Sequence, residues 1–175
     1  MPTTRSGKST EKTNVPITVK YKTPNTLGKD RLAGVVAAAV LYPNKNVLVI
    51  DAGSCITMDY IDKNKVYFGG RISPGIEMRY NSLKKFTKNL PKLTINTSFN
   101  LIGNDTNSSI VSGVQSGILA EVETIITDLR KENESLFVVV TGGDTIFFEN
   151  TLKNSIFADP FLVLKGLNEI LKYND

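Results

Sequence analysis

The sequence predicts an α/β layered fold, and three features of its apolar pattern carry that prediction. The runs Val47–Ile50 and Phe137–Val140 are continuously apolar, which is typical of strands buried on both faces of a sheet. Between them, Ser109–Leu129 has apolar residues at helical spacing along one stripe. Neighbouring strands followed by alternating helix and strand indicate helices layered on a sheet, with loops at the strand ends available for ligands.

The residues around the first buried strand supply three more elements. Cys55–Ile61 and Val66–Ile72 have strand composition and are joined by the turn residues 62–65, which predicts a hairpin. Before the buried strand, Ile17–Tyr21 is expected to be extended. Asp30–Leu41 is expected to be a helix of small apolar residues.

The remaining segments are helices, one loop and a polar start. Residues 1–16 are small, polar and rich in lysine, so a disordered leader is expected there. Residues 90–104 are expected to form a loop. Helices are predicted at Gly75–Phe86, Thr145–Lys153 and Pro160–Lys172.

Composition excludes several kinds of chemistry. Of 175 residues, 41% are hydrophobic, enough for one ordinary core, and none is histidine. Without histidine there is no Ser-His-Asp triad, Cys-His dyad or His-ligated zinc, so carboxylates are the leading candidates for a general base. The single cysteine, Cys55, and the absence of a long apolar run favour a reduced, cytoplasmic protein outside the membrane. The net charge of +4 comes from scattered Lys and Arg, so no nucleic-acid partner is expected.

Asp51 and the residues that follow it are the first candidate site. A buried strand ends in this carboxylate, and Gly53 then allows a ligand to approach the backbone closely. Ser54 and Thr57 can donate hydrogen bonds to phosphate oxygens, and Asp51 can hold a cation that offsets phosphate charge. The same residues also fit an ordinary turn in which Asp51 accepts hydrogen bonds from backbone amides. Spacing alone does not decide between the two.

Two further glycine-rich segments follow other predicted strands. Gly142 and Gly143 lie where the strand Phe137–Val140 leads into a helix, and such a junction exposes amides to an anion or a nucleotide. Gly69–Gly75 is expected to be a third glycine-rich loop. Each is explained equally well as a tight turn.

Gly28–Arg31 places opposite charges at the start of a predicted helix. In one interpretation Asp30 caps the helix and Arg31 is a surface residue. In the other, Asp30 is a general base for a hydroxyl group and Arg31 binds a carboxylate. Both remain open from this segment alone.

Taken together, five segments resemble one family, the type III pantothenate kinases, over roughly residues 17–172. In chain order they are Tyr21-x-Thr-Pro-x-Thr-Leu-Gly-x-Asp-Arg31, Ile-Asp51-x-Gly-Ser-x-x-Thr57-x-Asp59, Gly-Gly-x-Ile-Ser-Pro-Gly75-x-x-Met78, Gly103-x-x-Thr106-x-x-x-Ile110-x-x-Gly113 and Thr-Gly-Gly-Asp144. Each segment is weak alone, but the ordered set is specific.

The resemblance implies a fold and a reaction. The fold would be ribonuclease-H-like, as in actin-like ATPases, with two lobes around a nucleotide cleft. The reaction would be transfer of the γ-phosphate of ATP to the primary hydroxyl of pantothenate, the first step of coenzyme A synthesis. The family uses Mg²⁺ with ATP and a monovalent cation, K⁺ or NH₄⁺, and it forms homodimers whose interface contributes to the pantothenate site.

The resemblance also implies roles for individual residues. Asp30 would accept the proton of the pantothenate hydroxyl, and Asp51 would bind the monovalent cation. ATP would lie against Gly53, Ser54, Thr57, Gly142 and Gly143, with threonine more usual in the family where Ser54 stands. Pantothenate would be bound by Tyr21, Gly28, Lys29, Asp30, Arg31 and Thr106, with Arg31 facing the carboxylate.

One departure from the family pattern divides the chain. The family opens with an Asp-x-Gly-Asn-Thr loop that binds ATP phosphates, and nothing like it precedes Tyr21. We therefore expect one complete lobe at 45–159, a remnant of the first lobe at 17–44 and a helical end at 160–175 packing back towards that remnant. So small a remnant needs a partner surface for its apolar helix.

Three hypotheses follow from this departure. The chain represents a kinase of the family with a truncated reading frame; or it is a catalytically impaired or non-catalytic domain that binds pantothenate or dimerises; or it is a related transcriptional regulator. The residues of the substrate motif, Tyr21, Asp30, Arg31 and Thr106, argue against the third, because a regulator has no need of them.

Overall fold

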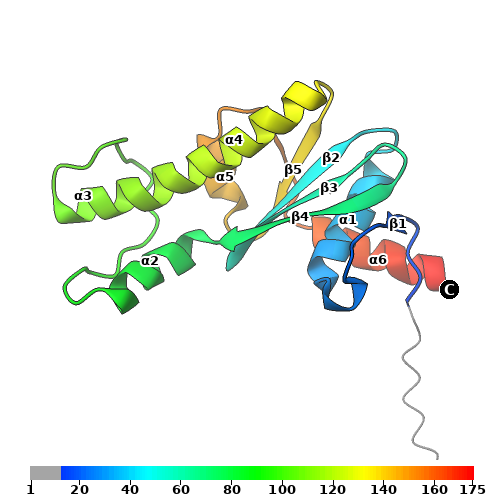
Figure 1. The fold of residues 1–175 in the computed structure, drawn as a ribbon, viewed down its shortest axis with the longest axis horizontal. Coiled ribbons are helices and arrows are strands. Elements are labelled where there is room, and N and C mark those ends of the chain that lie inside the picture. The colour runs from blue at the N-terminus through cyan, green and yellow to red at the C-terminus, as the bar shows by residue number, and fades with distance from the viewer. Residues whose placement is uncertain (1–12) are drawn as a thin grey trace, which may run out of the picture.

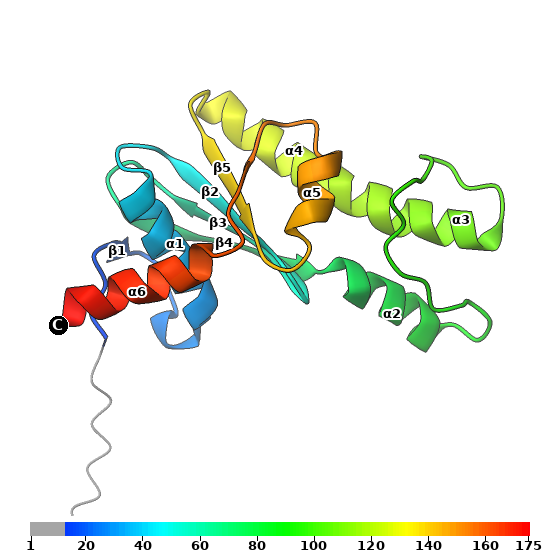
Figure 2. The same ribbon diagram turned by 180° about the vertical axis from the view of Figure 1, so that it is seen from behind.

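The structure is a computed structural model that describes residues 13–175. Most of the polar leader expected at 1–16 therefore lies outside the described residues. Within them, a mixed sheet is covered by helices on both faces (Figures 1 and 2). This confirms the predicted α/β layering.

The sheet has six strands in the order β1-β4-β3-β2-β5-β6. Their bounds are Thr18–Val19 (β1), Val47–Ala52 (β2), Cys55–Ile61 (β3), Val66–Pro74 (β4), Phe137–Thr141 (β5) and Phe157–Ala158 (β6). The central three, β2, β3 and β4, form an antiparallel meander, while β5 pairs in parallel with β2 and β6 in parallel with β5. This arrangement agrees with the predicted ribonuclease-H-like class. The short β1 adds to the edge of the same sheet, parallel to β4.

The helices form two layers. Their bounds are Lys29–Leu41 (α1), Ile76–Phe86 (α2), Thr106–Val111 (α3), Gly117–Glu132 (α4), Thr145–Thr151 (α5) and Leu162–Asn174 (α6). Helices α1 and α6 pack on one face of the sheet, and α4 and α5 pack on the other (Figures 1 and 2). Strand β2 alternates between the two cores, with Val47 and Val49 facing α1 and Leu48 and Ile50 facing α4. Burial on both sides explains why this strand is continuously apolar.

Helix α1 finds the partner surface that its small apolar residues require. The sheet covers one side, and α6 crosses it so closely that a Cβ on Gly166 would lie 1.9 Å from the carbonyl oxygen of Ala33. Ala33 through Ala39 are consequently buried. The division of the chain into a lobe and a remnant stays a prediction, but residues 17–44 contribute to the same layered body.

The helix predicted at Ser109–Leu129 runs from Thr106 to Glu132, through a π-helical segment at Ser112–Ser116. By length and mean hydropathy, 1.2 in its most apolar window, it resembles a membrane span. However, Ile118, Val122 and Ile126 are fully buried in the sheet-facing core. It is therefore a core helix of the described fold.

Two sequence expectations differ from the structure. Strand β4 runs from Val66 to Pro74, which confirms the strand predicted at Val66–Ile72, while the overlapping prediction of a loop at Gly69–Gly75 is wrong for Gly69 and Gly70. The reason is close pairing: a Cβ on Gly70 would lie 2.1 Å from the carbonyl oxygen of Met58 in β3. Strand β6 was not predicted, because two residues are too few to show a strand pattern.

Candidate functional site

The predicted loops after β2 and β5 lie side by side. The two strands are parallel, with Asp51 opposite Thr141, and the amide of Asp144 donates to the carbonyl oxygen of Ala52 at 2.9 Å. Gly142 has a φ of +95°, and a Cβ there would lie 2.5 Å from Oδ1 of Asp51. Only glycine fits such a contact, so the two loops form a single surface at the ends of the strands.

The junction between β4 and α2 adds a third glycine to this surface. The amide of Gly75 donates to the carbonyl oxygen of Ser54 at 3.0 Å. A Cβ on Gly75 would lie 2.1 Å from the carbonyl oxygen of Gly53. The start of α2 is thereby fixed against the loop after β2. Gly69 and Gly70, which lie earlier in β4, are not part of this surface.

Asp51 is an acid without a compensating partner. Its side chain is half-buried, and it accepts no hydrogen bond within residues 13–175, so the alternative in which it caps a turn is not observed. Burial raises the pKa of its carboxyl, and the carboxylates of Asp30 and Asp59 raise it further. Asp51 follows Val47 and Val49 on the face of β2 that packs against α1, and Asp59 pairs with Val49, so both carboxylates lie on the α1 side of the sheet. Such a carboxylate suits a cation.

The hydroxyl groups near Asp51 are available to a ligand. Thr57 pairs with Asp51 across the β2–β3 ladder and is half-buried, and Ser54 is exposed. Neither hydroxyl makes a hydrogen bond to another group in the described part of the chain. Both remain candidates for phosphate contacts.

Asp30 lies in the first turn of α1. Its Oδ1 accepts a hydrogen bond from the backbone amide of Arg31 at 2.8 Å, while the residue as a whole is exposed. Gly28 is the N-cap residue, and a Cβ there would lie 2.4 Å from the same Oδ1. Asp30 therefore satisfies one amide of the first turn, but it is not the N-cap residue that the simpler interpretation expected. Its other oxygen makes no hydrogen bond within residues 13–175. Lys29, one residue earlier, is also exposed.

Arg31 is buried, so its interpretation as a surface residue is wrong. Its guanidinium pairs with the carboxylate of Asp59, with Nε 3.0 Å from Oδ2 and Nη2 2.6 Å from Oδ1. The hydroxyl of Tyr67 donates to the same carboxylate at 2.6 Å. Asp59 and Tyr67 were given no role by the sequence. The signal for Asp59 was a carboxylate on the face of β3 that also buries Ile61.

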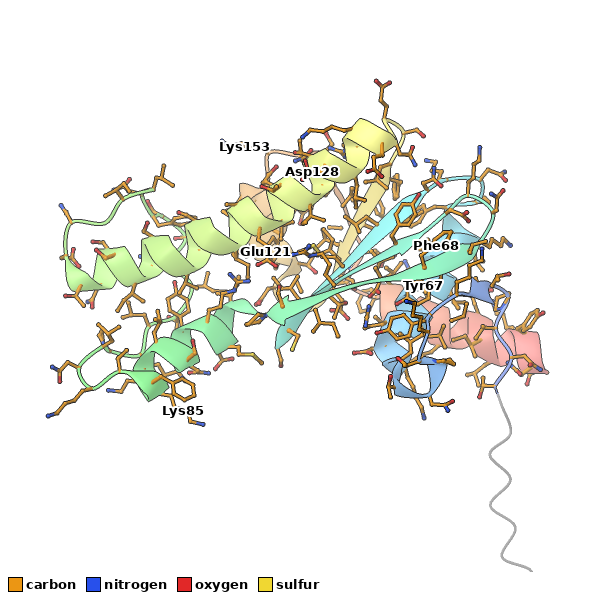
Figure 3. All side chains as sticks on the ribbon, viewed as in Figure 1. Tyr67, Phe68, Lys85, Glu121, Asp128 and Lys153 are labelled. Carbon is orange, nitrogen blue, oxygen red and sulfur yellow. The ribbon has the colours of Figure 1, made fainter. Side chains whose placement is uncertain are left out.

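Tyr21 completes this group. Its ring stacks on Tyr67, with centroids 6.2 Å apart, and lies 5.6 Å from the guanidinium carbon of Arg31. Gly69 has a φ of +121°, and a Cβ there would lie 3.2 Å from the ring of Tyr21. Figure 3 shows Tyr67 beside α1. The structure thus brings together Tyr21, Asp30 and Arg31.

Thr106, the remaining predicted pantothenate contact, lies elsewhere. It begins α3 and lines a cavity of about 740 Å³ between α2 and the long helix, together with Arg79 and Ile110. Figure 1 shows α3 at the opposite end of the molecule from α1 and α6. Within one chain, Thr106 is therefore not brought to Asp30 or Arg31.

A separate cavity of about 480 Å³ adjoins the loop after β5. Gly143, Asp144 and Phe147 form one wall, and residues 95–97 of the long loop form the other. Gly143 is exposed, with no atom within 4 Å of where its Cβ would be. The cavity is mainly apolar with a few polar groups, as nucleoside sites are.

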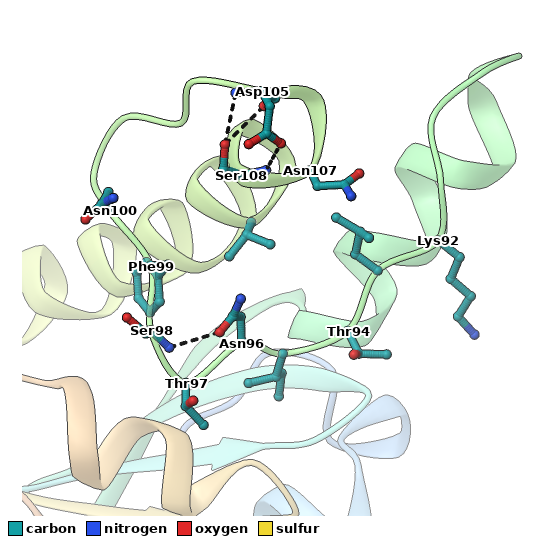
Figure 4. Close-up of a pocket in the computed structure, with 13 residues that line it drawn as sticks. Lys92, Thr94, Asn96, Thr97, Ser98, Phe99, Asn100, Asp105, Asn107 and Ser108 are labelled. Carbon is teal, nitrogen blue, oxygen red and sulfur yellow. Dashed lines mark hydrogen bonds between the residues drawn. The ribbon is translucent and has the colours of Figure 1, made fainter.

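The long loop is attached to the core by one buried side chain. Gln115 is fully buried in the π-helical segment and exchanges hydrogen bonds with the backbone of Asn96, at 2.7 and 2.8 Å. The hydroxyl of Tyr80 donates to the same amide oxygen at 2.8 Å. Figure 4 shows this loop, with Asn96 turned towards the amide of Ser98, around a further polar cavity of about 730 Å³. The sequence did not single out Gln115.

Among residues 13–175, no three His, Cys, Asp or Glu side chains are grouped so as to hold a metal ion. A cation at Asp51 would therefore share its shell with backbone oxygens, water or the ligand.

Comparison with known proteins gives consistent results. The family model described as type III pantothenate kinase matches residues 6–128. Relatives named type III pantothenate kinase include that of Phocaeicola vulgatus, 52% identical over 93% of this chain, and that of Christiangramia forsetii, 51% identical over 91%. The chain spans about two thirds of their length, 67% and 66%. A solved structure from Campylobacter jejuni, described as a "conserved putative Baf family transcriptional activator", is 29% identical, with a TM-score of 0.61 over 86% of this chain and 66% of its own.

Proposed function

The chain belongs to the type III pantothenate kinase family, and on that premise we propose that it phosphorylates pantothenate with ATP, using Asp30 as the catalytic base. The observation that carries the proposal is the shared location of Asp30 and Asp51. Asp30 is at the start of α1, and Asp51 is at the end of β2 on the face that α1 covers, where the Asp30 carboxylate is one of the charges that raise the pKa of Asp51. A hydroxyl acceptor beside Asp30 would thus face phosphates held beside Asp51.

The chemistry follows from this arrangement. The unpaired oxygen of Asp30 accepts the proton of the primary hydroxyl of pantothenate, while the hydroxyl oxygen attacks the γ-phosphorus of ATP. The bond between the γ-phosphorus and the β–γ bridging oxygen breaks, and ADP leaves with 4′-phosphopantothenate as the other product. Phosphoryl transfer depends on position and charge neutralisation, which explains how a chain without histidine performs it.

Other residues bind the two substrates. Gly53, Ser54 and Thr57 contact the phosphates of ATP, and the cavity beside Gly142 and Gly143 holds the nucleoside. Arg31 binds the carboxylate of pantothenate, and Tyr21, Gly28 and Lys29 line the pocket around it.

Two cations complete the proposed site. Asp51 binds K⁺ or NH₄⁺. Its half-buried negative charge is repelled by those of Asp30 and Asp59 and has no protein counterion in the described residues. Mg²⁺ accompanies ATP and offsets the charge of its phosphates.

We also propose that the chain acts as a homodimer in the cytoplasm. A second copy would bring its Thr106 to the Asp30 region, which one chain does not do. Apolar side chains near α2 and α3, the end that carries Thr106, support such an interface. They include Phe86, Leu101 and Ile102, which are 76–80% exposed. Sedimentation velocity should show a dimer at micromolar concentration. A monomer there would contradict this part of the proposal.

The deciding experiment measures pantothenate-dependent release of ADP by the purified chain, with pantothenate binding measured in parallel by calorimetry. Turnover supports the kinase. Binding without turnover favours the non-catalytic pantothenate-binding domain. Absence of binding, with DNA binding in its place, would favour the activator named for the Campylobacter jejuni relative.

A further inference from the structure

Asp59 is a buried charged residue for which the proposed mechanism has no use. It is 1% exposed, and its partner Arg31 is 7% exposed. Oδ2 of the carboxylate accepts from Nε of Arg31, and Oδ1 accepts from both Nη2 of Arg31 and the hydroxyl of Tyr67. Two kinds of donor from two elements therefore fix the carboxylate in one orientation.

This contact leaves Arg31 with one edge held and one edge available. A guanidinium has five N–H donors in a plane, and the Nε edge is the one that Asp59 occupies. The opposite nitrogen, Nη1, makes no well-formed hydrogen bond within residues 13–175, although the Tyr21 side chain lies near the guanidinium and helps to raise the pKa of Arg31. In that range, Ser73 Oγ is the one fully buried side-chain polar atom without a hydrogen bond. Nη1 has no well-formed hydrogen bond either, so it must be partly exposed to solvent. The ring of Tyr21 covers the guanidinium face at 5.6 Å.

The held edge changes what Arg31 offers to a ligand. A lone arginine side chain rotates freely and attracts any anion, whereas the pair with Asp59 is neutral overall and offers N–H groups in one direction. A carboxylate that meets the available edge forms charge-assisted hydrogen bonds of defined geometry. The hydrogen bond to Asp59 also raises the pKa of Arg31, so the side chain remains a donor at every relevant pH.

We propose that Asp59 is a positioning residue, which aims the available edge of Arg31 at the carboxylate of pantothenate, with the Tyr67 hydroxyl as its second support. The inference rests on the proposed function, since it concerns the same substrate. It predicts that Asp59 determines selectivity for the carboxylate end of the substrate. Asp30, at the hydroxyl end, is left to the phosphoryl transfer.

The test compares two ligands that differ only at that end. Pantothenate has a carboxylate, and pantothenyl alcohol has a hydroxymethyl group in its place. We expect Asp59→Asn to weaken pantothenate binding about tenfold, the equivalent of one charge-assisted hydrogen bond, and to leave the affinity for the alcohol within about twofold. Calorimetry on the full chain measures both affinities. If turnover is present, KM for pantothenate should rise by the same factor with little change in kcat.

Tyr67→Phe is the second variant, because it keeps the buried ring and removes only the hydroxyl donor. It should shift the ratio of the two affinities in the same direction by about threefold. It stays informative should Asp59→Asn fail to fold. Asp128→Asn is the matched control, an exposed carboxylate on α4 paired with Lys131, and should change neither affinity.

The outcomes separate the two proposals. If the variants weaken both ligands equally, Asp59 has only a structural role and the inference is overturned. An unchanged ratio in both variants overturns it as well. If the unmodified chain binds neither ligand, the proposed function itself fails and the inference falls with it.

Discussion

Oδ1 of Asp51 lies against the α-carbon of Gly142, so close that a Cβ at that position would be 2.5 Å from it. Asp51 ends β2 and Gly142 follows β5, strands that are far apart in sequence and paired in the sheet. The contact makes one unit of two loops that the sequence presented as separate glycine-rich motifs. The proposed ATP site lies across both loops.

Replacement of Gly142 by alanine should disrupt the contact between the loops after β2 and β5. The new methyl group has no room against Asp51 and Ala52, and the φ of +95° is unfavourable for alanine, so we expect a loss of about 1–3 kcal/mol in the free energy of unfolding. ATP binding should weaken as well. Gly143→Ala is the control, since no atom lies within 4 Å of its Cβ position. Urea unfolding compares the stability of the two variants, and calorimetry measures ATP binding by Gly142→Ala; because Gly143 lines the proposed nucleoside cavity, Gly143→Ala is a control for stability alone. Equal stability of the two would contradict the packing described here.

Asp30→Asn should abolish phosphoryl transfer and preserve nucleotide affinity. Asparagine can still accept the hydrogen bond from the amide of Arg31 but cannot take a proton from the substrate hydroxyl. We expect a fall in kcat of about 10²–10⁴-fold. Release of ADP and calorimetry with ATP measure the two effects. Activity within a few-fold of the unmodified chain would remove Asp30 from the mechanism.

Asp51→Asn should make the fold more stable at neutral pH. Burial, Asp30 and Asp59 raise the pKa of Asp51 above its ordinary value of 3.8, so the folded state binds this proton more tightly than the unfolded state does. The contribution of the Asp51 carboxyl to stability is therefore favourable below pH 3.8 and is lost as the pH rises through the pKa of this group in the folded state. The gain in melting temperature of the variant should be largest near neutrality and vanish below about pH 3.8.

The same variant tests the cation. K⁺ should raise the melting temperature of the unmodified chain, because it neutralises Asp51, and should have little effect on Asp51→Asn. Thermal unfolding in potassium and in tetramethylammonium salts makes the comparison. A K⁺ response that survives the substitution would end the assignment of Asp51 as its ligand.

Gly166→Ala should separate α1 from α6. Its methyl group would meet the backbone of Ala33 at 1.9 Å, and backbone atoms cannot move aside cheaply, so we expect a loss of about 3 kcal/mol in stability. Gly117→Ala is the matched control, at a helical position (φ −62°) with nothing within 4 Å. It should raise stability by about 0.5–1 kcal/mol. Chemical unfolding of both variants gives the two values, and similar values would refute the close helix crossing.

The strongly periodic elements were predictable from the sequence. Strands β2 and β5 and the long helix were predicted because burial produces an apolar pattern in the sequence. That pattern can be recognised without knowing which elements pack against them. The short strand β6 and the true extent of β4 were not, since pairing with another strand decides them. Gln115 was missed for a similar reason. One buried amide has no local signature, and its partners, Tyr80 and Asn96, are distant in sequence.

The sequence by itself determined the layered α/β class, the exclusion of histidine-based chemistry and the five ordered segments that place the chain in its family. Each of these follows from residue types and their local spacing. The tertiary structure alone decided that Asp51 and Asp30 share one region, that Arg31 is held by Asp59 and that Thr106 lies apart from both. Such relationships depend on which strands pair and which helices cross, and long-range packing of this kind leaves no mark on the spacing of neighbouring residues.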